Sequence, residues 1–283
     1  MLVRMDEILK EAQKGNYAVP APNVWNLETV YEAIHIAEEE KSPIILDYGE
    51  DTSVFYFDEI AMLAKYYASK TNIPVALNLD HGSSFETAIS AIRAGFTSVM
   101  VDRSSLPFED NLAQTKEICK IAHAANVSVE SELGHVGIGS EYNSDDVQGL
   151  TDPSKALEFV QKSECDCLAV AIGTSHGTYK GKPNLHFDLL ETIRKTVDVP
   201  LVLHGGSGTG DDNLVRAIKG GICKINLYTD LSNAGMDCFD KVYTNPETRS
   251  IDRTMVTLHE KPIEAYGEKL RYYCRLFGSS HKI

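Results

Sequence analysis

Three histidines, each followed by a glycine, stand directly after short apolar runs. His81 follows the run Pro74–Leu79 and one aspartate, and His176 and His204 close two later runs. Apolar runs of this length that stop near glycine are typical of buried β-strands. One such histidine fits a hydrogen-bonded core residue equally well, but three at equivalent positions indicate three imidazoles at one edge of a sheet. Three histidine ligands with an open fourth position suit catalytic zinc or a similar divalent ion.

A carboxylate, Asp80, immediately precedes the first of these histidines and is placed to act as a base beside a metal ligand. Glu130 and Glu132 share one face of their expected strand, because side chains alternate along a strand. The polar residues expected at strand ends are Asn23, Asp80, Asp102, Glu130, Glu132 and Asn226. The histidines interpreted as structural or exposed are His35, His123, His135, His186, His259 and His281.

The segment Gly205–Gly208 reads Gly-Gly-Ser-Gly and offers unhindered backbone N–H groups and one hydroxyl. Glycine-rich turns are common, so this motif is weak by itself. Its position strengthens it, because the loops after strands seven and eight of a barrel frequently hold a phosphate. We therefore expect a phosphate-bearing ligand at this loop.

Eight apolar segments, each followed by a helical pattern, organise most of the chain. This alternation predicts parallel strands with crossover helices, and the continuous Val, Ile, Leu and Ala runs predict strands buried on both faces. The expected strands are 17–23, 43–48, 74–80, 98–102, 127–133, 167–173, 200–204 and 222–227. Eight units fit an α/β fold of the (β/α)8 TIM-barrel type, and no Gly-x-Gly-x-x-Gly turn follows the first strand to favour a doubly wound open sheet.

We predict a single domain over residues 1–283, with two departures from the repeat. Residues 134–152 are glycine-rich and then acidic, and the stretch is too long for an ordinary strand-to-helix loop, which indicates a mobile lid. After Thr244 a further helix is expected near Arg253–Tyr273, interrupted or started by Pro262. This helix makes a C-terminal helical extension to the barrel.

The composition narrows the class of partner. The chain has 283 residues, is 43% hydrophobic and carries a formal net charge of -14, so counterion release gives no driving force for nucleic-acid binding. No apolar run approaches the roughly 20 residues of a membrane-spanning helix, and Met1–Glu7 lacks the apolar core of a signal peptide. The six cysteines form no Cys-x-x-Cys pair, which is typical of reduced thiols. We expect a cytoplasmic protein that binds a small molecule, with no nucleic acid and no membrane.

Motifs spread over most of the chain resemble one known family. They are Val19–Asn23, Leu79–Ser83, Ser98–Asp102, Glu130–Gly134, Ala171–Gly177, Leu203–Gly208, Lys224–Asn226 and the ending Phe277–Ser279. Together they resemble the metal-dependent (class II) ketose-bisphosphate aldolases, which include the fructose- and tagatose-bisphosphate enzymes. Such lyases cleave a 1,6-bisphosphate to dihydroxyacetone phosphate and an aldehyde, in pathways of carbohydrate metabolism such as glycolysis.

The resemblance implies a role for each site residue. His81, His176 and His204 would bind one catalytic Zn2+ per chain, and the ion would stabilise an enediolate as a Lewis acid. Asp80 would exchange the proton of the hydroxyl whose deprotonation breaks the carbon–carbon bond, and Asn226 would hydrogen-bond the enediolate. The other implied residues are Glu141 on the lid for the proton at the nucleophilic carbon; Asn23, Gly177, Gly205, Ser207, Tyr228 and Thr229 for the substrate and its phosphate; and Glu132 and Asp102 for an alternative metal position. The family also implies a homodimer or homotetramer and has room for a monovalent cation.

Departures from the family pattern concern the substrate and the lid. The strand-eight motif commonly reads Asn-x-Asp-Thr-Asp, whereas Tyr228 replaces the first aspartate here, and tagatose-type members carry alanine. The loop after strand two contains Glu50 and Asp51, which would disfavour a second phosphate if they face the substrate. Arg249 or Arg253 could serve a distal phosphate instead. The lid usually reads Gly-Gly-x-Glu-Asp, and here the matching glutamate is shifted by one residue.

We therefore expect a metal-dependent aldolase that reversibly cleaves a ketose (bis)phosphate. Fructose 1,6-bisphosphate, tagatose 1,6-bisphosphate and a less usual ketose 1-phosphate all remain open as substrates. A non-catalytic barrel that binds metal and sugar phosphate is a second possibility, and the presence of Asp80 argues against it. A barrel hydrolase is a third, but Pro22-Asn23-Val24 stands where such enzymes often carry a His-x-His pair.

Overall fold

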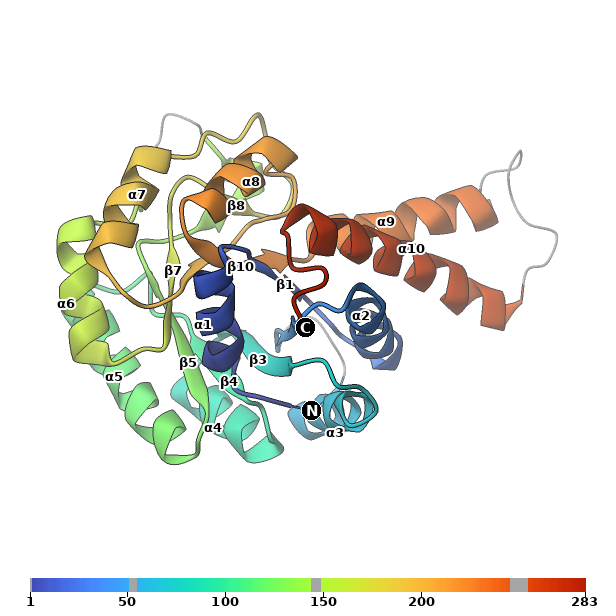
Figure 1. Cartoon of the computed structure of the whole chain (residues 1–283), viewed down its shortest axis with the longest axis horizontal. Coiled ribbons are helices and arrows are strands. Elements are labelled where there is room, and N and C mark those ends of the chain that lie inside the picture. The colour runs from blue at the N-terminus through green and yellow to red at the C-terminus, as the bar shows by residue number, and fades with distance from the viewer. Residues whose placement is uncertain (1, 51–54, 144–148, 245–253) are drawn as a thin grey trace.

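The computed structural model describes residues 2–50, 55–143, 149–244 and 254–283, with only the backbone for 255–257. Eight parallel strands follow one another around a barrel in the order β1-β10-β9-β7-β5-β4-β3-β2 (Figure 1). The end strands β1 and β2 meet at an isolated parallel bridge between Asn23 and Asp47. The barrel strands are β1 Val19–Pro22, β2 Ile44–Tyr48, β3 Val75–Gly82, β4 Ser98–Val101, β5 Ser128–Leu133, β7 Cys167–Val170, β9 Leu201–Leu203 and β10 Ile222–Leu227. The predicted TIM barrel is confirmed.

A helix follows each barrel strand, and all of these helices except the last, α9, pack on the outside of the ring. These helices are α2 Leu27–Glu40, α3 Phe57–Ala68, α4 Phe85–Ala94, α5 Phe108–Ala124, α6 Pro153–Ser163, α7 Phe187–Thr196, α8 Asp211–Lys219 and α9 Thr229–Phe239. Side-chain caps fix several starts: Asn26 accepts the Thr29 N–H at 3.0 Å, and Ser84 accepts the Thr87 N–H at 3.0 Å. None of the described helices is long and apolar enough to cross a membrane.

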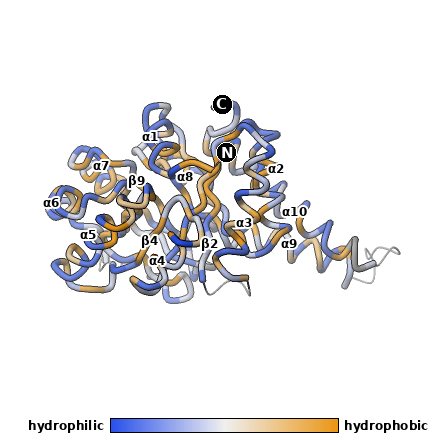
Figure 2. Tube along the Cα trace, turned by 90° about the horizontal axis from the view of Figure 1, so that it is seen from below, coloured by the Kyte–Doolittle hydropathy of each residue, from blue (hydrophilic) through white to orange (hydrophobic). Residues whose placement is uncertain are grey.

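The interior of the barrel changes character from one end to the other. Near the strand starts the inward-facing side chains are small and apolar, and helix α1 (Met5–Gly15) covers this end with Met5, Ile8, Leu9 and Ala12 (Figures 1 and 2). The strand residues of this cluster are Val19, Ala21, Ile45, Ala76, Cys167, Ala169, Val202 and Cys223. Further along the strands the buried inward positions become polar, with Asp47, Asn78, Glu130 and Lys224. The apolar end is closed by α1, so the polar end is the one that holds the site.

The predicted lid contains a short strand and a turn of helix. β6 (Gly137–Ile138) pairs in parallel with β8 (Ser175–His176), and the 3-10 turn Gly139–Glu141 follows. His176 therefore does not continue the barrel strand β7, which ends at Val170. The chain turns at Gly173, where φ is +104°, before it reaches β8. Residues 144–148 of the lid lie outside the described residues.

The C-terminal extension forms an arm beside the barrel. Helix α9 continues into a π-helical turn, Asp240–Thr244, and α10 (Met255–Leu276) lies alongside α9, so that both helices project away from the ring (Figures 1 and 2). Pro262 lies inside α10 rather than at its start. Arg249 and Arg253, the candidates for a distal phosphate, lie outside the described residues.

The carboxylate of Glu40, at the last residue of α2, anchors the end of the chain. It accepts hydrogen bonds from Arg271 (3.2 Å), Arg275 (2.7 Å) and Ser280 (2.8 Å), and the residue is only 5% exposed. The hydrogen bond from Arg275 is the main reason that the pKa of Glu40 falls to about 2, against the opposing effect of burial. The ionised carboxylate thus ties α10 and the tail to α2.

We predict that Glu40→Gln destabilises the protein by about 1–3 kcal/mol, because the amide loses hydrogen bonds to charged groups. The folded-state pKa lies below the usual value of 4.5, so this stabilisation is present above pH 4.5 and is lost as the pH falls toward 2. Urea unfolding at pH 7 and at pH 4 measures the effect. A gap between wild type and variant that widens toward pH 4 would contradict the role of Glu40.

Candidate metal centre and active site

A bulge at the end of β3 brings two consecutive residues to one side. Neighbouring residues of a regular strand face opposite ways, yet Asp80 and His81 both line the same cavity. The pairing register with β4 shifts between Leu79 and Gly82, and His81 has a φ of +49°. A side chain at Gly82 would place its Cβ 2.9 Å from the Met100 carbonyl oxygen. The positive φ of His81, which is not a glycine, stores of order 1–3 kcal/mol of backbone strain, as is typical of functional sites.

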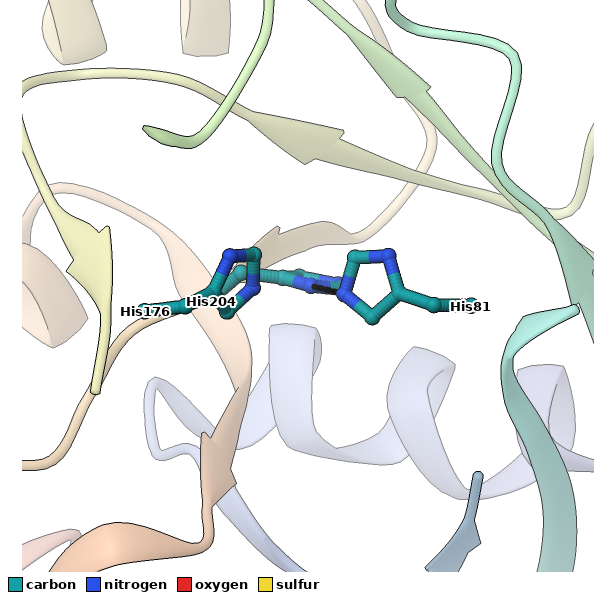
Figure 3. A group of neighbouring side chains, drawn as sticks. All are labelled: His81, His176 and His204. Carbon is teal, nitrogen blue, oxygen red and sulfur yellow. Dashed lines mark hydrogen bonds between the residues drawn. The ribbon is translucent and has the colours of Figure 1, made fainter. Parts of the chain in front are cut away.

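The three predicted histidines lie together at the polar end of the barrel (Figure 3). Their ring centroids are 4.6–5.7 Å apart, and one nitrogen from each lies within 4.8 Å of the others. His204 Nδ1 and His81 Nε2 are 2.7 Å apart, and the buried Nε2 of His176 has no hydrogen-bond partner among the described residues. Three converging imidazoles, one of them with an unsatisfied buried nitrogen, fit a divalent cation such as zinc.

In two of these rings, the nitrogen that faces away from the cluster contacts a carboxylate, a different one for each ring. Asp102 Oδ2 lies 3.0 Å from His81 Nδ1, and Glu130 Oε1 lies 2.7 Å from His204 Nε2. Such carboxylates orient metal-binding histidines and fix their tautomers. The pKa of His81 rises to about 10 although burial alone lowers it, because Asp80 and Asp102 favour its charged form. Burial beside the other two rings lowers the pKa of His176 to about 3.

A second group of ligands adjoins the first. His81, Asp102 and Glu132 bring one ligand atom each within 4.8 Å of one another. Glu132 is buried, one of its oxygens accepts the Val136 N–H at 2.9 Å, and the other has no hydrogen-bond partner in the part of the chain that the structure describes. Burial raises the pKa of this carboxyl. The residues predicted for an alternative metal position are therefore together in space.

Two amides hold the proposed base. Asn23 Nδ2 donates to Asp80 Oδ2 at 2.9 Å, and Asn226 Nδ2 donates to Asp80 Oδ1 at 3.1 Å. Although burial raises it, the pKa of Asp80 falls to about 2 because of the nearby positive charges, that of His81 first, and the hydrogen bond from Asn23. Asp80 is thus an ionised, oriented carboxylate beside the histidines. Asn23, predicted to bind substrate, contacts the base.

The glycine-rich loop lines a cavity of about 250 Å³ that His81 and His176 also line, while His204 lies behind it without lining it. At Gly205, φ is +67° and a Cβ would lie 2.3 Å from the Ser175 carbonyl oxygen, so only glycine fits. Ser207 Oγ accepts the Asp230 N–H at 3.1 Å, which leaves its own proton free to donate. The other phosphate candidates that line the cavity are Gly177 and Thr229. Thr229 is the first residue of α9, and helix N-termini favour anions.

Of the residues that were predicted to affect the choice of substrate, Tyr228 lines the cavity and Glu50 does not. Tyr228 lines the cavity, is 45% exposed and packs edge-on against Trp25 at 5.9 Å. Glu50 does not line it: its carboxylate accepts the Ser83 N–H at 2.8 Å and the Thr87 hydroxyl at 3.1 Å, at the start of α4. Asp51 lies outside the described residues.

Glu141 lies apart from the histidine cavity. It sits on the 3-10 turn of the lid and lines a neighbouring hollow with His135, Tyr142 and Thr174. The structure therefore brings together ten of the predicted site residues in one cavity and leaves Glu141 beside it. The ten are Asn23, Asp80, His81, His176, Gly177, Gly205, Ser207, Asn226, Tyr228 and Thr229.

Two residues that support the site were missed in the sequence. Lys224 is fully buried and contacts Glu130 Oε2 at 2.7 Å and Asp47 Oδ2 at 3.1 Å. Lys224 stands two residues before Asn226, so the two side chains lie on the same face of the strand. This spacing could have identified Lys224 from the sequence. Tyr179 accepts the Ser175 N–H at 2.8 Å and donates to the Gly205 carbonyl at 3.0 Å, and no sequence pattern marks it.

Comparisons with known proteins agree with this geometry. The family described as fructose-bisphosphate aldolase class-II matches residues 3–282. The fructose-bisphosphate aldolase of Geobacillus stearothermophilus is 47% identical over 237 residues, which cover 81% of each chain. Escherichia coli K12 YdjI is 38% identical over 278 residues, or 96% of each chain. The crystal structure of the YdjI aldolase aligns with a TM-score of 0.87 at 35% identity and covers 100% of this chain and 99% of its own.

The chain belongs to the class II fructose-bisphosphate aldolase family, because that family matches almost all of it. It is therefore an enzyme of the aldolase type, a carbon–carbon lyase. The predicted family, fold and enzyme class are confirmed. Class II aldolases are generally metal-dependent, in agreement with the cluster of histidines and carboxylates.

We predict that His176→Ala loses the divalent ion, because two imidazoles and water hold it far less firmly than three imidazoles. Metal analysis after dialysis measures the ion per chain for wild type and variant. His35→Ala is the matched control, since His35 lies on the surface of α2 against Tyr31. Equal metal content in wild type and His176→Ala would remove His176 from the ligand set.

Proposed function

We propose that this protein is a metal-dependent aldolase that reversibly cleaves a ketose (bis)phosphate to dihydroxyacetone phosphate and an aldehyde. The observation that carries the proposal is the position of Asp80, which two amides hold beside three histidines in a cavity walled by a glycine-rich loop. Carbon–carbon cleavage next to a ketone needs a base for a hydroxyl and an electron sink at the ketone. This cavity supplies the first and has the ligands for the second.

The residues of the chain divide the work. His81, His176 and His204 would hold one Zn2+, which when bound supplies the electron sink and orients the ketone oxygens. Asp80 accepts the proton of the hydroxyl on the aldehyde side, and the adjacent carbon–carbon bond breaks. Asn226 contributes hydrogen bonds on the ketone side. Asn23 keeps Asp80 in position and lines the substrate cavity.

Glu141 is proposed to deliver the proton to the carbon that the cleavage leaves with an electron pair. In the structure it lines the hollow beside the cavity, so this role requires the lid to move toward the histidines. Glu132 and Asp102 would offer an alternative position for the metal next to His81. A monovalent cation is part of the same proposal.

The phosphate of dihydroxyacetone phosphate is proposed to bind at the loop after β9 and the start of α9. Gly177, Gly205, Ser207 and Thr229 present backbone N–H groups and hydroxyls there, which suits an anion in an acidic protein because local dipoles outweigh the global charge. These four residues line the same cavity as His81 and His176.

Fructose 1,6-bisphosphate is the first candidate substrate, since it is named for the relative from Geobacillus stearothermophilus. A ketose 1-phosphate is the second, and Tyr228 favours it, because an aromatic ring lines the cavity where the family motif carries a carboxylate. Glu50 gives no support to either, since its carboxylate caps α4.

We also propose one domain over residues 1–283, a homodimer or homotetramer, and a location in the cytoplasm. The family match over residues 3–282 supports the single domain. All six cysteines are free thiols, in agreement with a reducing compartment. Light scattering of the purified protein measures the assembly.

We predict that Asp80→Asn lowers kcat by about 10²–10⁴-fold, because the amide cannot take the hydroxyl proton. The variant is expected to keep its metal, since the three imidazoles are unchanged. A coupled assay for dihydroxyacetone phosphate, together with metal analysis of the same sample, measures both. A normal rate with full metal content would exclude Asp80 as the base.

The substrate is tested with a panel of ketose 1-phosphates and 1,6-bisphosphates, each with and without a chelator. We expect retro-aldol products from at least one sugar and loss of activity after the metal is removed, with recovery on adding Zn2+. Full activity after exhaustive removal of metal would contradict the mechanism. Products that require water would indicate a hydrolase, and tight binding without products would indicate a non-catalytic binder.

A further inference from the structure

We propose that Glu130 and Lys224 are positioning residues for His204, which set its tautomer and thereby the affinity of the centre for a divalent cation. The inference rests on the proposed metal-dependent function and concerns residues that do not line the substrate cavity. Neither Glu130 nor Lys224 lines that cavity, so Glu130 acts on the reaction through His204, whereas Lys224 acts through Glu130 and through its charge near Asp80.

The hydrogen-bonding capacities of the three groups fix the direction of each bond. Lys224 Nζ has donors only, so Glu130 Oε2 accepts from it at 2.7 Å. The other oxygen, Oε1, faces His204 Nε2 at 2.7 Å. A carboxylate paired with an ammonium group accepts at both oxygens, so His204 carries its proton on Nε2. The lone pair of Nδ1 then points toward His81 and the centre of the cluster.

The anchor of this chain of bonds is built from four strands. Lys224 on β10 also contacts Asp47 on β2 at 3.1 Å, and Asn78 on β3 donates to Asp47 at 2.9 Å, while Glu130 lies on β5. All four side chains are buried within the barrel. If Glu130 turned away from His204, the buried ammonium of Lys224 would lose its 2.7 Å partner and keep only the contact with Asp47 at 3.1 Å.

A contrast within the same site sharpens the inference. His81 also has a carboxylate on its outer nitrogen, but the Asp102 side chain is 24% exposed, whereas the Glu130 side chain is 0% exposed. Water can replace part of the Asp102 contact and has no access to Glu130. His204 is thus the ligand whose orientation depends on protein groups alone.

The test measures Zn2+ affinity by competition with a chromogenic chelator, without any substrate. Glu130→Gln is expected to weaken Zn2+ binding by about 10- to 100-fold, the usual loss when a partner of a metal-binding histidine is removed. Lys224→Met is expected to act in the same direction, because Glu130 loses its anchor. Glu40→Gln is the matched control, since Glu40 is a buried, arginine-paired carboxylate at the end of α2. Its Zn2+ affinity should equal that of wild type.

A measurement on the wild type keeps the inference testable if the variants do not fold. In the 15N NMR spectrum of the Zn2+ form with labelled histidine, one metal-binding ring should keep its proton on Nε2 and bind the metal through Nδ1. The signal is assigned to His204 by its disappearance in His204→Ala. The metal on Nε2 of His204 would overturn the inference, and so would unchanged affinity in a folded Glu130→Gln.

The two proposals fail separately in these experiments. If Glu130→Gln binds Zn2+ more weakly while the wild type cleaves none of the sugars in the panel, the positioning role stands and the lyase assignment is rejected. If Glu130→Gln binds Zn2+ as tightly as the wild type while the wild type cleaves a sugar of the panel, the positioning role is rejected and the lyase assignment stands.

Discussion

The barrel depends on neutralising one charge, that of Lys224, deep in its interior. Burying an ion costs several kcal/mol even after the protein relaxes, and removing one member of a buried pair leaves the other uncompensated. Glu130 and Asp47 provide the compensation, and the ammonium beside Glu130 lowers that carboxyl's pKa against burial, whereas burial raises the pKa of Asp47. These contacts join β2, β5 and β10, so the register of three strands is coupled to the pairing of one charge.

The site follows from the same geometry of alternation. Inward-facing positions are apolar where α1 closes the barrel, become charged around Lys224, and reach histidines and amides at the strand ends. Parallel strands all end at one rim, which gathers ligands from distant parts of the chain. The bulge at His81 turns two successive residues, a carboxylate and an imidazole, toward the same cavity. The polar residues of the cavity and those around Lys224 thus form one continuous layer.

The sequence predicted the barrel and most of the cavity, because strand periodicity and strand ends are local signals. It placed His176 at the end of a barrel strand, whereas the turn at Gly173 moves this residue to β8, a two-residue strand that pairs with β6 of the lid. It did not predict α1, whose buried face has meaning only once a barrel end exists to be covered. Tyr179 was missed for a related reason, since its bonds to Ser175 and Gly205 join segments that only the folded ring brings together.

The strands β1 and β2 close the ring through an isolated β-bridge between Asn23 and Asp47, and the side chain of each of these residues makes a further contact. The side chain of Asn23 holds Asp80, and that of Asp47 holds Lys224. A breathing motion that parts β1 from β2 therefore releases the carboxylate of Asp80 and the buried ammonium at the same instant. A partly opened barrel thus loses the order of its polar interior while its outer helices are still in place.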